Sequence, residues 1–352
     1  IDYSTGAKAF LLENQSTNII PYSEDFSQWI PTRSSVSINN LISPDGTLNA
    51  TKISETSDNG FHAISIVSNV VSGVSHTVSV FIKKGTNEFV QFLFGTNNVT
   101  GNPYVNFDVN QGVFQNNGAI SANIQDFGNG WYKCSITVTP AVTSFTFFVS
   151  SIQSISSYRV NTFVGNVNNN IYIYGAQLEQ QSYATSYIPT SGASATRNQE
   201  LCNNATPVIN SEEGTLYAEM ATLADTDSIY RAISVSDGTT SNRAIIRYNL
   251  GASDITFLYV KDGVASANIY HIGSEKASDF NKFAFSWKLN EFKVYLNGTQ
   301  VGVTDTVGNV SNAFTKLSFN DGVANPFYGN TKGLKVYPKA LADVQLEDLT
   351  QV

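Results

Sequence analysis

The chain has 352 residues, about twice the usual length of a single domain, so two domains with separate cores are expected. Charged residues make up only 14% of the chain, the formal net charge is −8, and no basic run is present, which argues against nucleic-acid and anionic-membrane partners. The two cysteines argue against a disulfide framework, and no apolar stretch approaches the roughly 20 residues of a membrane span.

Asn, Ser, Thr and Gly take the place of the missing charged residues, and aromatic residues reach 12%. Exposed helix faces are normally filled with Lys, Glu, Arg and Ala, whereas aromatic and β-branched side chains suit the pleated surface of a sheet. The composition therefore predicts an all-β fold with little helix.

Residues 1–17 contain a short apolar patch, and we expect a lead-in segment that packs on one of the domains. Residues 18–190 contain short apolar or alternating runs separated by clusters of Gly, Asn and Ser. These runs are 76–82, 88–94, 104–109, 131–138, 145–150 and 170–176. In the first run Val78, Val80 and Ile82 point to one side and the intervening residues to the other, which is the period of a β-strand. This part of the chain is expected to form a jelly roll.

Residues 191–206 are expected to form a linker, because Gly192 and a cluster of small polar residues interrupt every pattern there. Strand-like runs resume in a second domain, 207–352. They are 215–223, 244–250, 255–260, 282–289 and 292–298. Asn297-Gly298 predicts a tight hairpin turn, and LADVQLEDL predicts one short C-terminal helix. The expected architecture is two antiparallel β-sandwich or jelly-roll domains in tandem.

Several ordered phrases resemble a jelly-roll module common in phage tail and fibre proteins, which is similar to carbohydrate-binding modules. They are NIIPYSEDFSQW (18–29), SPDGTLNATKI (43–53), FDVNQGVF (107–114), DFGNGWYKCSITV (126–138) and IYIYGAQLEQQSYATSYIPT (171–190). The second domain resembles the concanavalin A-like, laminin-G-type lectin domain through YLNGTQVG (295–302) and GLKVYPKALADVQLEDLT (333–350). The resemblance implies a recognition protein of a phage tail or fibre, or the binding region of a secreted polysaccharide-acting protein.

Sugar binding requires an exposed aromatic ring for the apolar face of a pyranose, together with polar groups for its hydroxyls. In the first domain Trp29 and His62 are candidates. Trp29 is equally compatible with a core position. His62 could hydrogen-bond a sugar hydroxyl, and a surface role without a ligand is the alternative. Six candidates gather around strands of the second domain. They are Arg243, Arg247, Tyr248, Tyr259, Tyr270 and His271. Trp131 and Trp287 lie on apolar strand faces and are expected in the cores.

Nucleophilic catalysis and transition-metal chemistry have no visible agent in the sequence, because no HExxH, paired-cysteine or GxSxG spacing occurs. Glycoside hydrolysis needs two carboxylates that flank one bond, whereas Glu212 and Glu213 are adjacent and precede a strand. Asp225, Asp227 and Asp321 lie in Gly- and Asn-rich turns and are candidate calcium ligands. Turn formation by Asp is the alternative explanation for all three.

The sequence thus favours a non-catalytic glycan-recognition protein, located outside a cell or on a virion tail, with a poly- or oligosaccharide and other virion subunits as partners. A homotrimer is expected only by analogy with fibres. One alternative is a structural or decoration protein of a virion that binds only other proteins. Another is a glycoside hydrolase or lyase of the concanavalin-like fold. The chain begins at Ile1 rather than Met, which suggests a piece of a longer protein.

Overall fold

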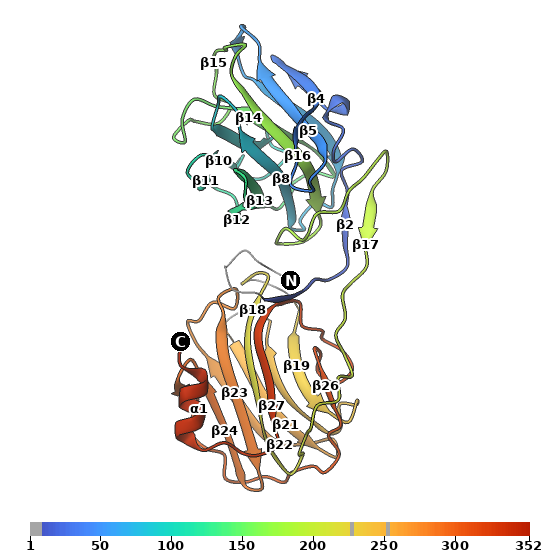
Figure 1. Ribbon diagram of the computed structural model, residues 1–352, viewed down its shortest axis with the longest axis vertical. Coiled ribbons are helices and arrows are strands. Elements are labelled where there is room, and N and C mark those ends of the chain that lie inside the picture. Colours follow the sequence, from blue (N-terminus) through green and yellow to red (C-terminus); the bar gives the residue numbers. More distant parts are fainter. Residues whose placement is uncertain (1–8, 226–228, 251–253) are drawn as a thin grey trace. The chain divides into compact units, whose positions relative to one another are not determined.

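The computed structural model describes residues 9–225, 229–250 and 254–352. These residues form antiparallel sheets with one short 3₁₀ helix, η1 (Phe26–Gln28), and one C-terminal α-helix, α1 (Asp343–Thr350) (Figure 1). The prediction of an all-β fold of sandwich domains with a single short helix at the end is confirmed. The chain divides into two compact units, which we call the N-terminal unit (residues 15–198) and the C-terminal unit (residues up to Asn14 and from Gln199 to Val352).

The N-terminal unit is a sandwich of two six-stranded antiparallel sheets. In spatial order the first contains β11 (Val113–Asn117), β10 (Tyr104–Asp108), β9 (Phe89–Phe94), β14 (Ser144–Ser151), β7 (Ala63–Asn69) and β3 (Ile30–Thr32). The second contains β12 (Ser121–Asp126), β13 (Trp131–Val138), β8 (His76–Lys84), β16 (Asn170–Glu179), β5 (Leu48–Glu55) and β4 (Ser34–Ile42). Two small ribbons complete the unit: β15 (Phe163–Val164) with β6 (Asn59–Gly60), and β17 (Ala195–Arg197) with β2 (Ser16–Asn18).

The core of this unit follows from strand periodicity. Val78, Val80 and Ile82 of β8 all join the main core, whereas Phe81 belongs to a separate aromatic cluster on the other face of the same sheet. Aromatic rings fill much of the space between the sheets, and the Phe92 ring meets that of Phe147 edge-on with 5.2 Å between the centroids. Such edge-on contacts add to the stabilisation that burial of the rings provides.

The C-terminal unit has a six-stranded and a five-stranded antiparallel sheet. The six-stranded sheet contains β1 (Phe10–Leu12), β27 (Gly329–Tyr337), β18 (Glu213–Thr222), β23 (Asn281–Lys288), β24 (Glu291–Leu296) and β25 (Thr299–Gln300). The five-stranded sheet contains β22 (Val264–Ile272), β21 (Asp254–Lys261), β20 (Arg243–Tyr248), β19 (Arg231–Ser236) and β26 (Lys316–Ser318). Asn297 (φ 48°) and Gly298 (φ 81°) form the hairpin turn between β24 and β25 that the sequence predicts.

Helix α1 covers part of the outer face of the six-stranded sheet. The Leu346 side chain is fully buried in a small cluster that includes Ala284 of β23 and Tyr295 of β24. The Lys293 ammonium lies 2.8 Å from the Asp343 carboxylate in the first turn of the helix, and this ion pair fastens the helix to β24.

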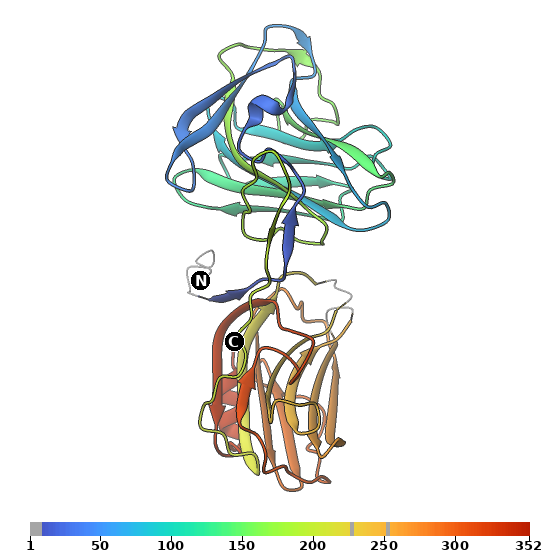
Figure 2. The same cartoon turned by 90° about the vertical axis from the view of Figure 1, so that its right-hand side faces the viewer.

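The first strand of the chain completes the C-terminal unit, because β1 pairs with β27 from Phe10↔Thr331 to Leu12↔Gly329. The chain then enters the N-terminal unit through β2 and leaves it through β17, and these two strands pair with each other. The N-terminal unit is therefore inserted into the sequence of the C-terminal unit after its first strand (Figures 1 and 2).

The sequence-derived boundaries differ from these units in a specific way. The expected lead-in segment, residues 1–17, is divided between β1 of one unit and the beginning of β2 in the other, and the expected linker, residues 191–206, contains β17. No helix among the described residues is long and apolar enough to cross a membrane.

We predict that Leu12→Ala destabilises the C-terminal unit, because the Leu12 side chain is only 3% exposed and packs in its core. Removal of a buried leucine side chain at such a site costs about 2–4 kcal/mol of the free energy of unfolding. Urea unfolding of the full chain measures this cost. Phe10→Ala on the same strand is the matched control, since Phe10 is 44% exposed; an equal loss in both variants would contradict the prediction.

Candidate functional site

The outer face of the five-stranded sheet brings several of the predicted ligand-binding residues together. In β20 the side chains alternate: Ala244, Ile246 and Tyr248 point into the core, so Arg243 and Arg247 lie on the outer face. The neighbouring strands contribute to the same face, because residues that pair in register share one side of a sheet.

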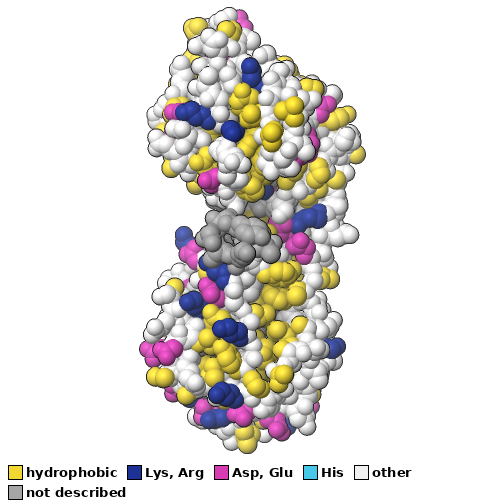
Figure 3. Space-filling view, viewed as in Figure 1, with side chains coloured by type: hydrophobic (Ala, Val, Ile, Leu, Met, Phe, Trp, Pro, Cys, Tyr) yellow, Lys and Arg dark blue, Asp and Glu magenta, His cyan; other side chains and the backbone are white. Residues whose placement is uncertain are grey.

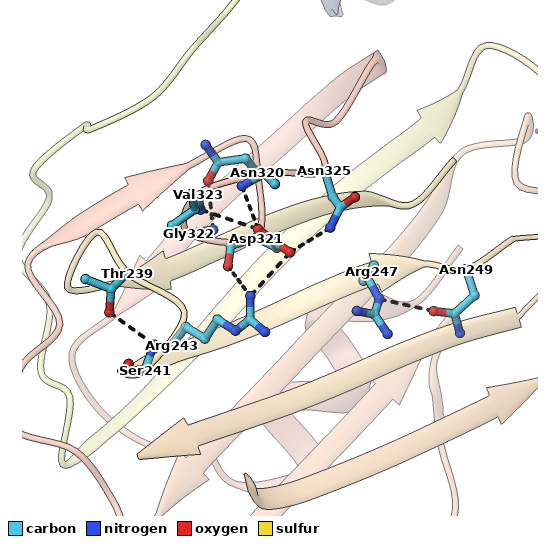
Figure 4. A network of polar contacts seen from close by, with 11 residues as sticks. Thr239, Ser241, Arg243, Arg247, Asn249, Asn320, Asp321, Gly322, Val323 and Asn325 are labelled. Atoms are coloured by element: carbon cyan, nitrogen blue, oxygen red, sulfur yellow. Dashed lines mark hydrogen bonds and ion pairs between the residues drawn. The ribbon is translucent and has the colours of Figure 1, made fainter. Parts of the chain in front are cut away.

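Arg243 fastens a loop to this face (Figure 4). Its Nη1 atom donates a 2.6 Å hydrogen bond to the Asp321 carbonyl oxygen and lies 3.3 Å from the Asp321 carboxylate. The same carboxylate accepts hydrogen bonds from the Ala324 backbone N–H at 2.9 Å and from the Asn325 side chain at 2.8 Å. Arg243 is thereby occupied by protein, and its role is to hold the loop after β26.

The Asp321 carboxylate stays ionised because its hydrogen-bond donors lower its pKa by more than burial raises it. Burial acts to raise the pKa of this group, but the hydrogen bonds from Ala324 and Asn325 and the charge of Arg243 lower the pKa below the ordinary value for aspartate. The Arg243–Asp321 pair is therefore a charged contact at neutral pH.

Arg247 is held in place without being neutralised. Its guanidinium carbon lies 4.5 Å from the centroid of the Tyr230 ring. Its Nε atom donates a 3.2 Å hydrogen bond to the Asn249 side-chain oxygen (Figure 4). Asn249 is in turn hydrogen-bonded to the Thr256 hydroxyl. Among the residues that the structure describes, no hydrogen bond or ion pair engages the two terminal nitrogens of Arg247.

Tyr270 lies in the same row as Arg247. Arg247 pairs in register with Thr256 of β21, and Thr256 pairs with Tyr270 of β22. The Tyr270 side chain is 51% exposed, and its hydroxyl donates a 2.6 Å hydrogen bond to the Asp254 carboxylate, which raises the pKa of the tyrosine. An anchored guanidinium and an exposed aromatic ring thus stand on one polar surface.

Three aromatic candidates have no face open to a ligand, which corrects the expectation that they contact sugar. Tyr248 and Tyr259 are 2% and 0% exposed, and the Tyr259 hydroxyl donates to the Ser211 carbonyl oxygen at 2.7 Å. Trp29 is 2% exposed, packs on Phe26, and donates from its ring nitrogen to a backbone carbonyl. All three rings belong to cores.

The two histidine candidates are also occupied within the protein. The His62 side chain is fully buried, with Nδ1 placed 2.7 Å from the Arg33 carbonyl oxygen and the ring packed on Phe163, which corrects the expectation of a surface role. His271 is partly exposed, but it lies on the inward side of β22 and its Nε2 atom is 3.0 Å from the Glu275 carboxylate.

The calcium expectation stays a prediction. Asp227 lies outside the described residues. Asp225 accepts a hydrogen bond from the Ser278 backbone, and Asp321 is surrounded by the donors given above. Among the described residues, no group of three or more His, Cys, Asp or Glu side chains is arranged to hold a metal ion.

Tyr230 and Asn249, the two residues that hold Arg247, are not among the candidates that the sequence suggests. Arg247 and Tyr248 are both among those candidates, although adjacent residues of a strand point to opposite faces. The alternation in AIIRYNL was the available signal: if Ile246 and Tyr248 are core residues, Arg247 must face outward.

No protein-family model and no curated protein matches the chain. Several solved structures are similar in fold. The carbohydrate-binding module CBM40 of the Ruminococcus gnavus IT-sialidase, bound to α2,3-sialyllactose, shares 19% identity over 40% of this chain and 84% of its own (TM-score 0.34). A heptameric SAP-like pentraxin from Limulus polyphemus shares 13% sequence identity over 41% of this chain and 72% of its own (TM-score 0.33). Domains LG4–5 of the mouse laminin α1 chain share 10% sequence identity over 81% of this chain and 90% of their own (TM-score 0.29).

We predict that Asp321→Asn destabilises the C-terminal unit at pH 7 by about 1–3 kcal/mol, the range for loss of charged hydrogen bonds at a buried site. A carboxylate whose pKa is lower in the folded state stabilises the fold above its unfolded pKa of about 3.9, and this contribution disappears as the pH falls. In urea unfolding experiments the difference between the variant and the wild-type chain should therefore stay constant from pH 7 to about pH 5 and shrink as the pH falls further towards the lowered pKa of the folded state.

Asp262→Asn is the matched control. Asp262 is exposed in a turn of the five-stranded sheet, so this substitution removes the same charge without removing buried hydrogen bonds. A cost that is independent of pH, or equal in the two variants, would contradict the assigned role of Asp321.

Proposed function

We propose that the chain is a non-catalytic glycan-recognition protein and that the row Arg247–Thr256–Tyr270 is one of its binding surfaces. The observation that carries the proposal is Arg247, which is stacked on Tyr230 and hydrogen-bonded to Asn249 while its terminal nitrogens have no described acceptor. A guanidinium held in this way loses little conformational entropy when it binds a hydroxyl or carboxylate.

The surroundings of Arg247 suit a sugar better than they suit a reaction. Tyr270 offers a half-exposed ring for the apolar face of a pyranose, and Asn249 and Asp254 add hydrogen-bonding groups around it, while the buried Thr256 hydroxyl holds Asn249 in place. The surface lies on regular strands, so its side chains are positioned before the ligand arrives.

The wider setting is part of the proposal. We infer a role in a phage tail or fibre, or in the binding region of a secreted polysaccharide-acting protein, from the resemblance of the sequence to such modules. Display in several copies, for example on a homotrimeric fibre, would raise the avidity of individually weak sites through effective concentration.

An array of neutral and acidic oligosaccharides tests the proposal with the full chain. We expect binding to at least one class of glycan, and Arg247→Gln should lower the affinity about 10–100-fold, because charged hydrogen bonds contribute roughly 1.5–3 kcal/mol. Tyr270→Ala should weaken the same interactions. Lys335→Gln, which removes the same charge from β27 in the other sheet, is the control. Absence of binding by the wild-type chain would favour a decoration protein that binds only other proteins.

A further inference from the structure

A second surface combines lysines and aromatic rings on the N-terminal unit. In register across four strands, Lys52 of β5 pairs with Tyr172 of β16, Tyr172 with Lys83 of β8, and Lys83 with Trp131 of β13. Paired residues share a face of the sheet. Their neighbours along the strands are core residues, so this row lies on the outer face. These neighbours are Ile53, Ile82, Ile171 and Ile173.

The row has a buried end and an accessible middle. Trp131 is 2% exposed, and its ring nitrogen donates to the Ile42 carbonyl oxygen at 3.2 Å. Lys52, Tyr172 and Lys83 are each partly exposed. Beside them the Phe127 ring, 44% exposed, packs edge-on against Phe81 with 4.9 Å between the centroids. Figure 3 shows Lys or Arg side chains beside hydrophobic side chains on this unit.

Neither lysine of the row is neutralised by a described carboxylate. The Lys83 ammonium donates to the Asn129 carbonyl oxygen, which leaves its charge uncompensated, and no hydrogen bond or ion pair engages Lys52 within the described chain. Lys84, the next residue of β8, points to the opposite side and forms a 2.6 Å ion pair with Glu88. Residues 15–198 contain 7 basic and 9 acidic residues (net −2), so two cations without a carboxylate partner are unusual on this unit. The carboxylates of Glu24 and Asp45 lie further along the same face, where they accept hydrogen bonds from the Tyr174 hydroxyl.

We propose that Lys52, Tyr172, Lys83 and Phe127 bind an anionic polysaccharide, with sugar rings against Tyr172 and Phe127 and acid groups against the two ammonium groups. The lysines stand two strands apart, about 10 Å between their backbones, so they reach acid groups on different sugar residues of one chain. Two cations are too few to neutralise the successive phosphates of a nucleic acid, so a nucleic-acid ligand is disfavoured at this surface. This site is separate from the Arg247 row and does not depend on it.

Affinity electrophoresis of the full chain tests the site, in an Arg247→Gln background so that the C-terminal unit does not contribute. The gels contain polygalacturonate, dextran sulfate or neutral dextran. We expect retardation by a carboxylated or a sulfated polymer but not by dextran, and the two anionic gels identify the acid group. The double variant Lys52→Gln/Lys83→Gln should weaken retention at least tenfold, and added salt should weaken it too, because exposed charges are screened.

Lys84→Gln is the matched control, since it removes the same charge from the adjacent residue on the opposite side of β8. Equal loss in this variant, equal retention by dextran or by single-stranded DNA, or no retention by either anionic polymer would overturn the proposal. Tyr172→Ala should also reduce retention, and circular dichroism verifies the fold of each variant. Loss of all retention in the Arg247→Gln background alone would assign the anionic ligand to the C-terminal unit instead.

Discussion

The pleat of an antiparallel strand fixes the side of the sheet to which each residue points, and the structure depends on this constraint throughout. In β20 one set of alternate residues builds the core while the other set presents Arg243 and Arg247 outward. A register shift by one residue would bury both guanidinium groups and expose Ile246, at a cost of several kcal/mol for each unpaired charge. The core and the proposed binding surface are thus specified by the same alternation.

Two parts of the outer faces are closed by loops that buried polar side chains hold in place. On the sheet of β9 and β10, the Gln91 and Asn106 side chains bond to each other at 2.7 Å and also donate to the carbonyl groups of residues 155–158. In the C-terminal unit Arg243 and Asp321 do the same for the loop after β26. Each tie satisfies groups that would otherwise be buried without partners, so these parts of the outer faces are covered by protein.

Fold class was predictable from the sequence because period-two runs and Gly- and Asn-rich turns depend only on local residues. The hairpin at Asn297 and the buried positions of Trp131 and Trp287 followed from the same local signals. The pairing of β1 with β27 was not predictable, because it joins residues more than 300 positions apart.

The proposed binding surface could be predicted from the sequence only in part, for a related reason. Arg247 and Tyr270 were found by residue type, but the partners of Arg247 depend on how three strands align. The row of Lys52, Tyr172 and Lys83 was missed altogether, since its members come from distant segments and only the register places them side by side. Trp29 was expected as a possible ligand contact but is buried, because the residues beside an aromatic side chain near a turn do not indicate whether that side chain is buried or exposed.

The pairing of β2 with β17 brings the entry and exit of the N-terminal unit together. The Thr17 and Thr196 hydroxyl groups lie 2.8 Å apart across this ribbon. A unit whose two ends are adjacent can be exchanged for another of different specificity, or shortened to a simple turn, without rethreading the host sandwich.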